Sequence, residues 1–273
     1  MTRSLRKYLT VADLHWQRWL AYRFDFLLDV AFSFIPTVVT VLVWQAVFAQ
    51  RYGGAATVGA YTLAQAITYT LLSRLLAALL STERLQSELI IEIREGGLSK
   101  LLVKPIDALG YRLAVFLAQG AAYALAVAVP NLAIFWVLRR YFLPPAGGAD
   151  LALAIMATGL AALLAFALGH LVATLAFWWE EVSSVLYLEQ RVLEFFAGTF
   201  VPLDLMPRGL VAVMRWLPFE YLAYFPAKVY LGQLTAAEIQ RGLFTQGVWV
   251  SVLLFLAANL WRRGLRRYTA AGM

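Results

Sequence analysis

Three charged side chains, Glu189, Arg191 and Glu194, lie in one otherwise apolar stretch of the sequence, residues 183–201. A charge at the centre of a bilayer costs about 2.5–3.5 kcal/mol on insertion scales, so such residues need a reason to be there. Arg191 and Glu194 are three residues apart, a spacing that lets them pair on one face of a helix. Two interpretations stay open: the pair fixes helix packing, or these residues line or gate a translocation path.

The sequence carries no pattern typical of a catalytic or metal site. The only histidines, His15 and His170, are far apart, and there is no H-E-x-x-H zinc motif and no cysteine. A G-x-x-x-x-G-K-[ST] phosphate loop and a G-x-S-x-G nucleophile motif are also absent. We therefore expect a chain that is not an enzyme and that holds no metal, ATP or other cofactor of its own.

A polar segment, residues 83–107, separates two apolar stretches and carries five acidic and four basic residues. Within it, Leu85, Leu89 and Ile93 recur at helical spacing and form one apolar stripe, with the acidic residues on other faces. A pair of glycines then allows a sharp turn, and a proline ends the helical pattern. An apolar ridge flanked by charge suits a groove on a soluble protein; a solvated loop helix is the alternative.

Long apolar helices must position these residues. The chain has 273 residues, of which 62% are hydrophobic and 14% charged, and its mean hydropathy is +0.71. Since a helix needs about 20 apolar residues to cross a bilayer, this composition is typical of an all-α, multi-span membrane protein. We predict a single transmembrane domain over residues 1–273. Its six spans are expected at residues 26–48, 58–80, 109–138, 151–178, 183–201 and 243–261.

The basic residues favour one orientation, because Lys and Arg concentrate in cytoplasmic loops. Five lie in residues 1–25, four in residues 83–107 and four in residues 262–267, against six or seven on the other side. Both termini and the polar segment are therefore predicted to be cytoplasmic, and topology explains the net charge of +7 better than nucleic acid does. Residues 1–25 also combine apolar and basic residues at helical spacing, which predicts an amphipathic helix on the membrane surface.

The external segment before the last predicted span, residues 202–232, is apolar but contains four of the nine prolines. Proline removes a backbone donor and clashes with the preceding turn, so a straight span through this segment is excluded. We expect a re-entrant helical hairpin whose irregular backbone is buried in protein or lines a cavity. An apolar external loop packed on the bundle is the alternative.

Two motifs and the overall plan resemble the permease subunits of type-2 (ABC-2-like) ABC exporters, in a bacterial branch of six-span proteins of about this length. The first motif is Glu95–Ile106, where a glycine pair is followed by a leucine-rich turn and Lys-Pro-Ile. The second is the external run that contains Val201-Pro202-Leu203, Met206-Pro207, Leu217-Pro218-Phe219 and Phe225-Pro226-Ala227. The likeness covers nearly the whole chain.

The resemblance implies a chain that pairs with a second permease, paralogous or identical, and docks on a separate ABC-type ATP-binding subunit that holds ATP and Mg. Residues 81–108 would form the coupling loop between the second and third spans. The residues implied to couple to the ATPase are Leu85, Leu89, Glu92, Glu95, Gly97, Leu98, Leu101, Lys104 and Pro105. The external segment, with Pro202, Pro207, Pro218 and Phe219, would close the outer end of the pathway.

The expected function is therefore ATP-driven export across the cytoplasmic (inner) membrane by alternating access. Frequent aromatic residues in the spans favour a hydrophobic or amphipathic substrate, although ordinary core packing explains them as well. The main alternative is an ion-coupled secondary transporter that uses Glu189 and Glu194, and a lipid scramblase is a third possibility. Contact with membrane lipid is expected in each case, and binding of nucleic acid in none.

Overall fold

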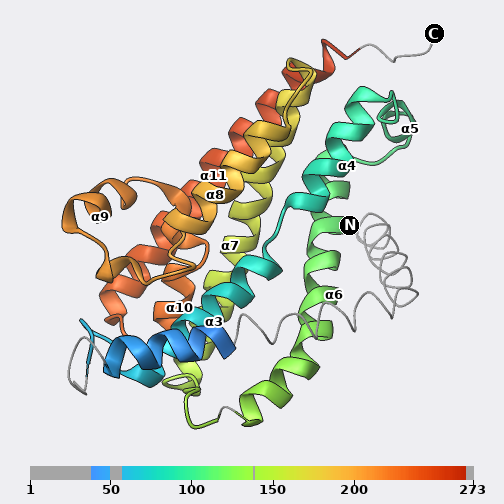
Figure 1. The fold of residues 1–273 in the computed structure, drawn as a ribbon. Helices are drawn as coiled ribbons and strands as arrows, with labels where there is room; N and C mark the ends of the chain where they lie inside the picture. Colours follow the sequence, from blue (N-terminus) through green and yellow to red (C-terminus); the bar gives the residue numbers. More distant parts are fainter. Residues whose placement is uncertain (1–37, 50–56, 138, 269–273) are drawn as a thin grey trace.

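The computed structural model describes residues 38–49, 57–137 and 139–268, with the backbone alone for residues 124–137 (Figure 1). In this part of the chain the fold is all-helical, and its one β-type contact is an isolated bridge between Val58 and Tyr61. The predicted all-α class is confirmed. The predicted surface helix, residues 1–25, lies outside the described residues, as does the start of the first predicted span.

Each predicted span overlaps in sequence with at least one helical segment of the described residues. These segments are Val38–Ala49, α3 (Leu63–Leu79), α4 (Glu83–Arg94), α5 (Ser99–Leu102), α6 (Ala108–Val137), α7 (Gly148–Thr174), η1 (Leu175–Phe177), α8 (Ser183–Phe196), η2 (Leu203–Leu205), α9 (Arg208–Met214), η3 (Pro218–Tyr221), α10 (Tyr224–Tyr230) and α11 (Ala236–Leu265). Among the described residues, three stretches are long and apolar enough to cross a membrane: Leu63–Arg94, Gly148–Phe177 and Ala236–Leu265. The number of six spans stays a prediction.

The helix in residues 183–201 is shorter than expected. α8 ends at Phe196 after 14 residues, a length of about 21 Å, which is less than the roughly 30 Å of a hydrocarbon core. The chain turns at Gly198, whose φ of +72° lies in the left-handed region that glycine adopts without strain. α8 therefore runs only partway along the bundle (Figure 1).

The core is built on α7 and α11, which run side by side (Figure 1). Ala157 of α7 is fully buried at this contact. Gln246 of α11, also fully buried, donates from Nε2 to the carbonyl oxygens of Ala157 at 2.8 Å and Tyr221 at 3.1 Å. A Cβ on Gly242 would lie only 2.2 Å from the ring of Phe225 in α10. Small residues and one buried amide thus hold α7, α10, α11 and η3 together.

α4 follows α3 after a short break at residues 80–82 and packs along the second half of α7. Thr82 is buried in this break, and a Cβ on Gly169 of α7 would lie 2.6 Å from the Thr82 side chain. The close contact brings α4 to the end of the molecule where α11 ends, and α5 lies at the same end (Figure 1). α3, α9 and α10 lie toward the other end.

Candidate functional site

α4 and α5 form a short helical hairpin, residues 83–102. Gly96, in the turn between them, has a φ of +75°, which favours glycine. The Leu98 N–H donates to the Glu92 carbonyl oxygen at 3.0 Å, and a Cβ on Gly97 would lie 3.5 Å from the Glu92 backbone. The sharp turn predicted at the glycine pair is therefore present, and Glu92 forms part of it.

The apolar stripe of α4 faces the inside of this chain, which corrects the expectation that it fits a groove on a partner. Four of the implied coupling residues are buried: Leu85, Leu89, Leu98 and Leu101. The last three pack in one cluster with Phe177 and Trp261. Helical periodicity predicts that a face is covered, but it does not specify what covers it.

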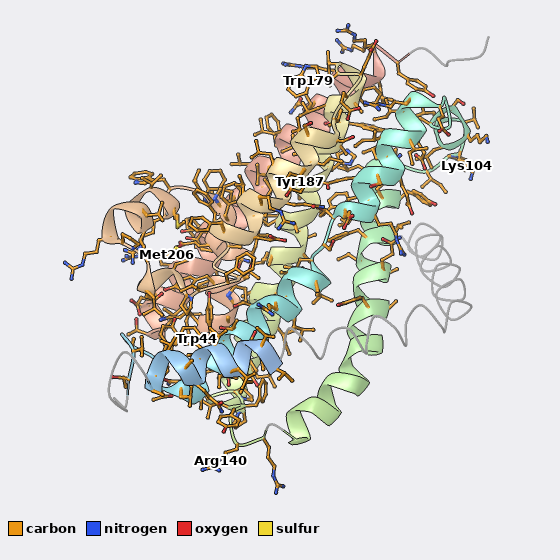
Figure 2. The ribbon with its side chains drawn as sticks, viewed as in Figure 1. Trp44, Lys104, Arg140, Trp179, Tyr187 and Met206 are labelled. Atoms are coloured by element: carbon orange, nitrogen blue, oxygen red, sulfur yellow. The ribbon has the colours of Figure 1, made fainter. Side chains whose placement is uncertain are left out.

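The opposite face of the hairpin is open. The segment in which α5 ends, residues 102–105, exposes Leu102 and Val103, and Val103 is 83% exposed. We name this segment the hairpin tip. The implied coupling residues Glu95, Lys104 and Pro105 are exposed as well. Figure 2 shows Lys104 and Trp179 at the same end of the molecule, with Arg140 at the opposite end.

Two shallow cavities flank α4 where it meets the turn between α7 and α8. One has a volume of about 230 Å³ and is lined by Arg94, Ala176, Phe177, Trp178, Trp179 and Glu180. The other has a volume of about 180 Å³ and is lined by Ser87, Ile90, Ile91, Arg94, Val182, Ser183 and Leu186. Arg94 borders both cavities. The open face of α4 and residues 176–186 therefore border the same cavities, and the hairpin tip lies at the same end of the molecule (Figure 2). We name these three parts together the docking face.

Arg112 of α6 contributes to this region, although the sequence patterns did not indicate it. Its side chain is 4% exposed, and Nη2 lies 2.5 Å from Oε2 of Glu92. Its guanidinium carbon lies 5.7 Å from the ring centroid of Trp261 in α11. The implied coupling residue Glu92 is thus engaged within this chain. A partner 20 positions away lies outside helical spacing, so periodicity alone could not have found this pair.

The structure places Glu189 of α8 apart from the ion pair that Arg191 and Glu194 form. Glu189 faces α4, where its Oε2 accepts a 2.5 Å hydrogen bond from Nε2 of the buried Gln86. Arg191 and Glu194 form the predicted ion pair, at 2.6 Å, and the Arg191 side chain is 52% exposed. The pairing is therefore confirmed. Glu189 and Glu194 therefore have different partners, Gln86 and Arg191.

Prolines divide the external segment into short helices, as predicted. Pro202 and Pro207 directly precede η2 and α9, and Pro218 is the first residue of η3. A missing N–H is tolerated at these positions. The ring of Phe219 lies 5.8 Å from that of Phe196, which ends α8. The segment therefore packs against the C-terminal end of α8, and its role in closing a pathway stays a prediction.

A second group that the sequence patterns did not indicate is centred on Asp204 of the external segment. Its carboxylate accepts hydrogen bonds from Lys228 Nζ at 2.7 Å, from the Tyr61 hydroxyl at 3.2 Å and from the Tyr224 hydroxyl. The Lys228 ammonium is buried and lies 5.2 Å and 5.7 Å from the ring centroids of Tyr61 and Tyr224. The sequence did contain a signal for this pair: Asp204 and Lys228 are opposite charges in one apolar segment, and charges that become buried usually pair.

The environment of Asp204 acts on its pKa in two directions. Burial raises the pKa, but the hydrogen bonds from Lys228 and Tyr224, together with the charge of Lys228, outweigh this and hold it below its ordinary value. The carboxylate is therefore ionised near neutral pH and accepts all three hydrogen bonds.

No group of three or more His, Cys, Asp or Glu side chains within the described ranges is placed to hold a metal ion. No curated protein matches the chain. A family model described as ABC-2 family transporter protein matches residues 34–272, which include the hairpin, α8 and the external segment. This chain belongs to the ABC-2 family of transporter proteins.

Proposed function

We propose that this chain is the permease of an ATP-driven exporter and that it docks on a separate ATP-binding subunit through the α4–α5 hairpin. Family membership supports an ABC-type permease. The observation that carries the docking proposal is the hairpin tip, where Leu102 and Val103 are exposed beside Lys104 and Pro105. The tip lies at the same end as the arginine-rich end of α11, which the distribution of Lys and Arg favours as the cytoplasmic side.

The docking face has the composition of a protein interface. Exposed apolar side chains at Ile91, Leu102 and Val103 lie among exposed charges at Arg84, Glu88 and Arg94, and interfaces combine an apolar centre with a polar rim in this way. The two cavities beside Arg94 offer space for side chains of the partner. ATP and Mg are held by the partner subunit in this proposal, so the energy for transport enters through this contact.

We further propose six crossings of the cytoplasmic membrane with both termini cytoplasmic. In this arrangement α8 lies in the fifth crossing, and the external segment, residues 202–232, packs against its outer end. Pro202, Pro207, Pro218 and Phe219 then lie near the outer end of the path.

A second permease chain, paralogous or identical, is proposed to cover α8. None of its residues is buried, and Tyr187 and Leu188 are more than 60% exposed. The Arg191–Glu194 pair lies on an open face, where contact with lipid tails would be costly. A neighbouring chain or a water-lined path lowers that cost. Alternating access between two such chains suits a hydrophobic or amphipathic substrate.

The docking proposal is tested by substituting Val103→Asp and capturing the tagged chain from its native membrane in mild detergent. Leu98→Asp is unsuitable because Leu98 is fully buried and a charge there would unfold the hairpin. Val213→Asp is the matched control, since Val213 is an exposed valine in α9 at the other end. We expect wild type and Val213→Asp to capture an ATP-binding subunit, and Val103→Asp to lose it by about tenfold or more, equivalent to about 1.4 kcal/mol.

Undiminished capture and ATP hydrolysis by Val103→Asp would show that the tip is not the docking site. Capture of no ATP-binding subunit by the wild-type chain would contradict the ATP-driven mechanism itself. Transport in liposomes driven by an ion gradient, or lipid scrambling without ATP, would then identify the other function.

A further inference from the structure

Arg112 joins three helices through one buried side chain. It lies near the start of α6, pairs with Glu92 of α4 at 2.5 Å, and places its guanidinium 5.7 Å from the ring centroid of Trp261 in α11. Arg112 and Lys228 are the two buried charged residues in the described part of the chain. A buried guanidinium is costly unless it is paired, so Glu92 and Arg112 are held together.

The surroundings give Arg112 no second anion. Its Nε has no hydrogen-bond partner among the described residues, and neither has Nδ1 or Nε2 of the fully buried His170. His170 stacks on Phe166 and lies 5.3 Å from Trp261, centroid to centroid. Apolar residues of similar volume commonly replace a buried ion pair without loss of stability. Stability alone therefore does not account for a charge here, whereas a fixed geometry between α4 and α6 does.

Glu92 also belongs to the hairpin turn. Its carbonyl oxygen accepts the N–H of Leu98, and Gly97 packs against it. Trp261 is fixed in turn, since its ring centroid lies 5.5 Å from that of Phe177, and a Cβ on Gly264 would lie 2.2 Å from Phe177. A displacement of the hairpin tip thus reaches α11 through a short chain of buried contacts.

We infer that Arg112 is a positioning residue that makes the hairpin, the start of α6 and the end of α11 move as one body when the ATP-binding subunit moves the tip. The inference rests on the proposed function and adds to it the route by which motion enters the bundle. Glu92 contributes to this connection by its ion pair with Arg112 inside the chain, whereas the exposed tip contacts the ATP-binding subunit.

The chain has no cysteine, so pairs of spin labels report defined distances after Lys100→Cys, Arg263→Cys or Val213→Cys. Lys100 is an exposed residue of α5 that lies outside the hairpin tip. Labels at 100 and 263 report the distance from the hairpin to α11, and labels at 263 and 213 report the distance from α11 to the far end. The sample is the nanodisc complex with its co-purified ATP-binding subunit, with and without ATP and vanadate. Variants are Arg112→Gln, Glu92→Gln and the charge-reversed pair Glu92→Arg with Arg112→Glu.

With wild type, we expect nucleotide to leave the 100–263 distance unchanged and to shift the 263–213 distance. In Arg112→Gln and Glu92→Gln, the 100–263 distance should shift and the population showing the 263–213 shift should fall about fivefold or more. The charge-reversed pair should restore the wild-type pattern. Arg241→Gln, which removes an exposed charge of α11 outside the docking face, should match wild type.

Wild-type distances in both Arg112→Gln and Glu92→Gln, with the ATP-binding subunit bound, would overturn the inference. If Arg112→Gln does not fold, Glu92→Gln decides, because it removes one charge from a partly exposed side chain. If the wild-type chain captures no ATP-binding subunit, the proposed function fails. The connection is then judged on the chain alone, where a 100–263 distribution equally narrow in wild type and Glu92→Gln would refute it.

Discussion

Lys228 in α10 donates a 2.7 Å hydrogen bond to Asp204 in η2, joining two short helices 24 residues apart. The contact crosses the proline-rich segment, whose pieces are too short to be stable helices alone. The hydroxyl groups of Tyr61 and Tyr224 complete the shell of Asp204. The external segment therefore owes its arrangement to polar contacts as well as to apolar packing.

Asp204→Asn should destabilise the folded chain by about 1–3 kcal/mol, because the Lys228 ammonium is left buried without an anion. Breaking a fully buried ion pair costs about 3–5 kcal/mol. The expected cost is smaller here because the Asp204 side chain is 25% exposed and water screens part of the interaction. Thermal unfolding in detergent, followed by tryptophan fluorescence, measures the effect. Glu88→Gln, at an exposed carboxylate, should change stability by less than about 0.5 kcal/mol, and an equal loss in both variants would contradict the role given to the pair.

The stabilisation by Asp204 should depend on pH. The folded state holds the Asp204 pKa below its ordinary value of 3.8, so the unfolded chain binds more protons as the pH falls. The contribution is complete above the ordinary pKa and is lost as the pH falls through the folded pKa. We expect unfolding midpoints of wild type and Asp204→Asn to differ most near about pH 6 and to converge below about pH 4. A difference that stays constant across this range would contradict the assignment.

Gly242→Ala and Gly247→Ala, five residues apart in α11, should have opposite effects. A Cβ at Gly242 would lie 2.2 Å from the Phe225 ring, whereas a Cβ at Gly247 meets nothing within 4 Å. We expect Gly242→Ala to cost about 1–3 kcal/mol by overpacking and Gly247→Ala to add about 0.5–1 kcal/mol through helix propensity. Paired unfolding midpoints measure both. Stabilisation by both substitutions would show that α10 and α11 are not in close contact.

Gln246→Leu should weaken the junction of α7, α11 and η3. The substitution removes the donor of two hydrogen bonds to the carbonyl oxygens of Ala157 and Tyr221. We expect a loss of about 1–2 kcal/mol in the same unfolding assay. Gln240→Leu changes an exposed glutamine of the same helix and should have little effect; a comparable loss there would contradict the account.

Local spacing predicted the elements of this fold well. The 3.6-residue pattern of α4, the glycine turn after it and the proline breaks of the external segment could all be predicted from the sequence. Residues close together in the sequence determine each of these features. The Arg191–Glu194 pair was readable for the same reason, since its partners are three residues apart on one helix.

Contacts between distant segments could not be predicted in the same way. The stripe of α4 was readable, but its contact with Phe177 and Trp261 depends on how α7 and α11 pack. The Arg112–Glu92 and Lys228–Asp204 pairs depend on tertiary structure as well, and so does the end of α8 at Phe196. The buried leucines therefore support the hairpin, and the implied coupling residues Glu95, Lys104 and Pro105 are the ones that stay exposed.

The exposure of α8 has a consequence for the stability of the isolated chain. A 14-residue helix with no buried residue has little within its own chain to keep it ordered. Its amide protons should exchange with solvent earlier than those of α7 and α11 while the chain is alone. If the proposed second permease covers α8, folding of this helix is completed on pairing, and a chain made without its partner should be cut by proteases at α8 first.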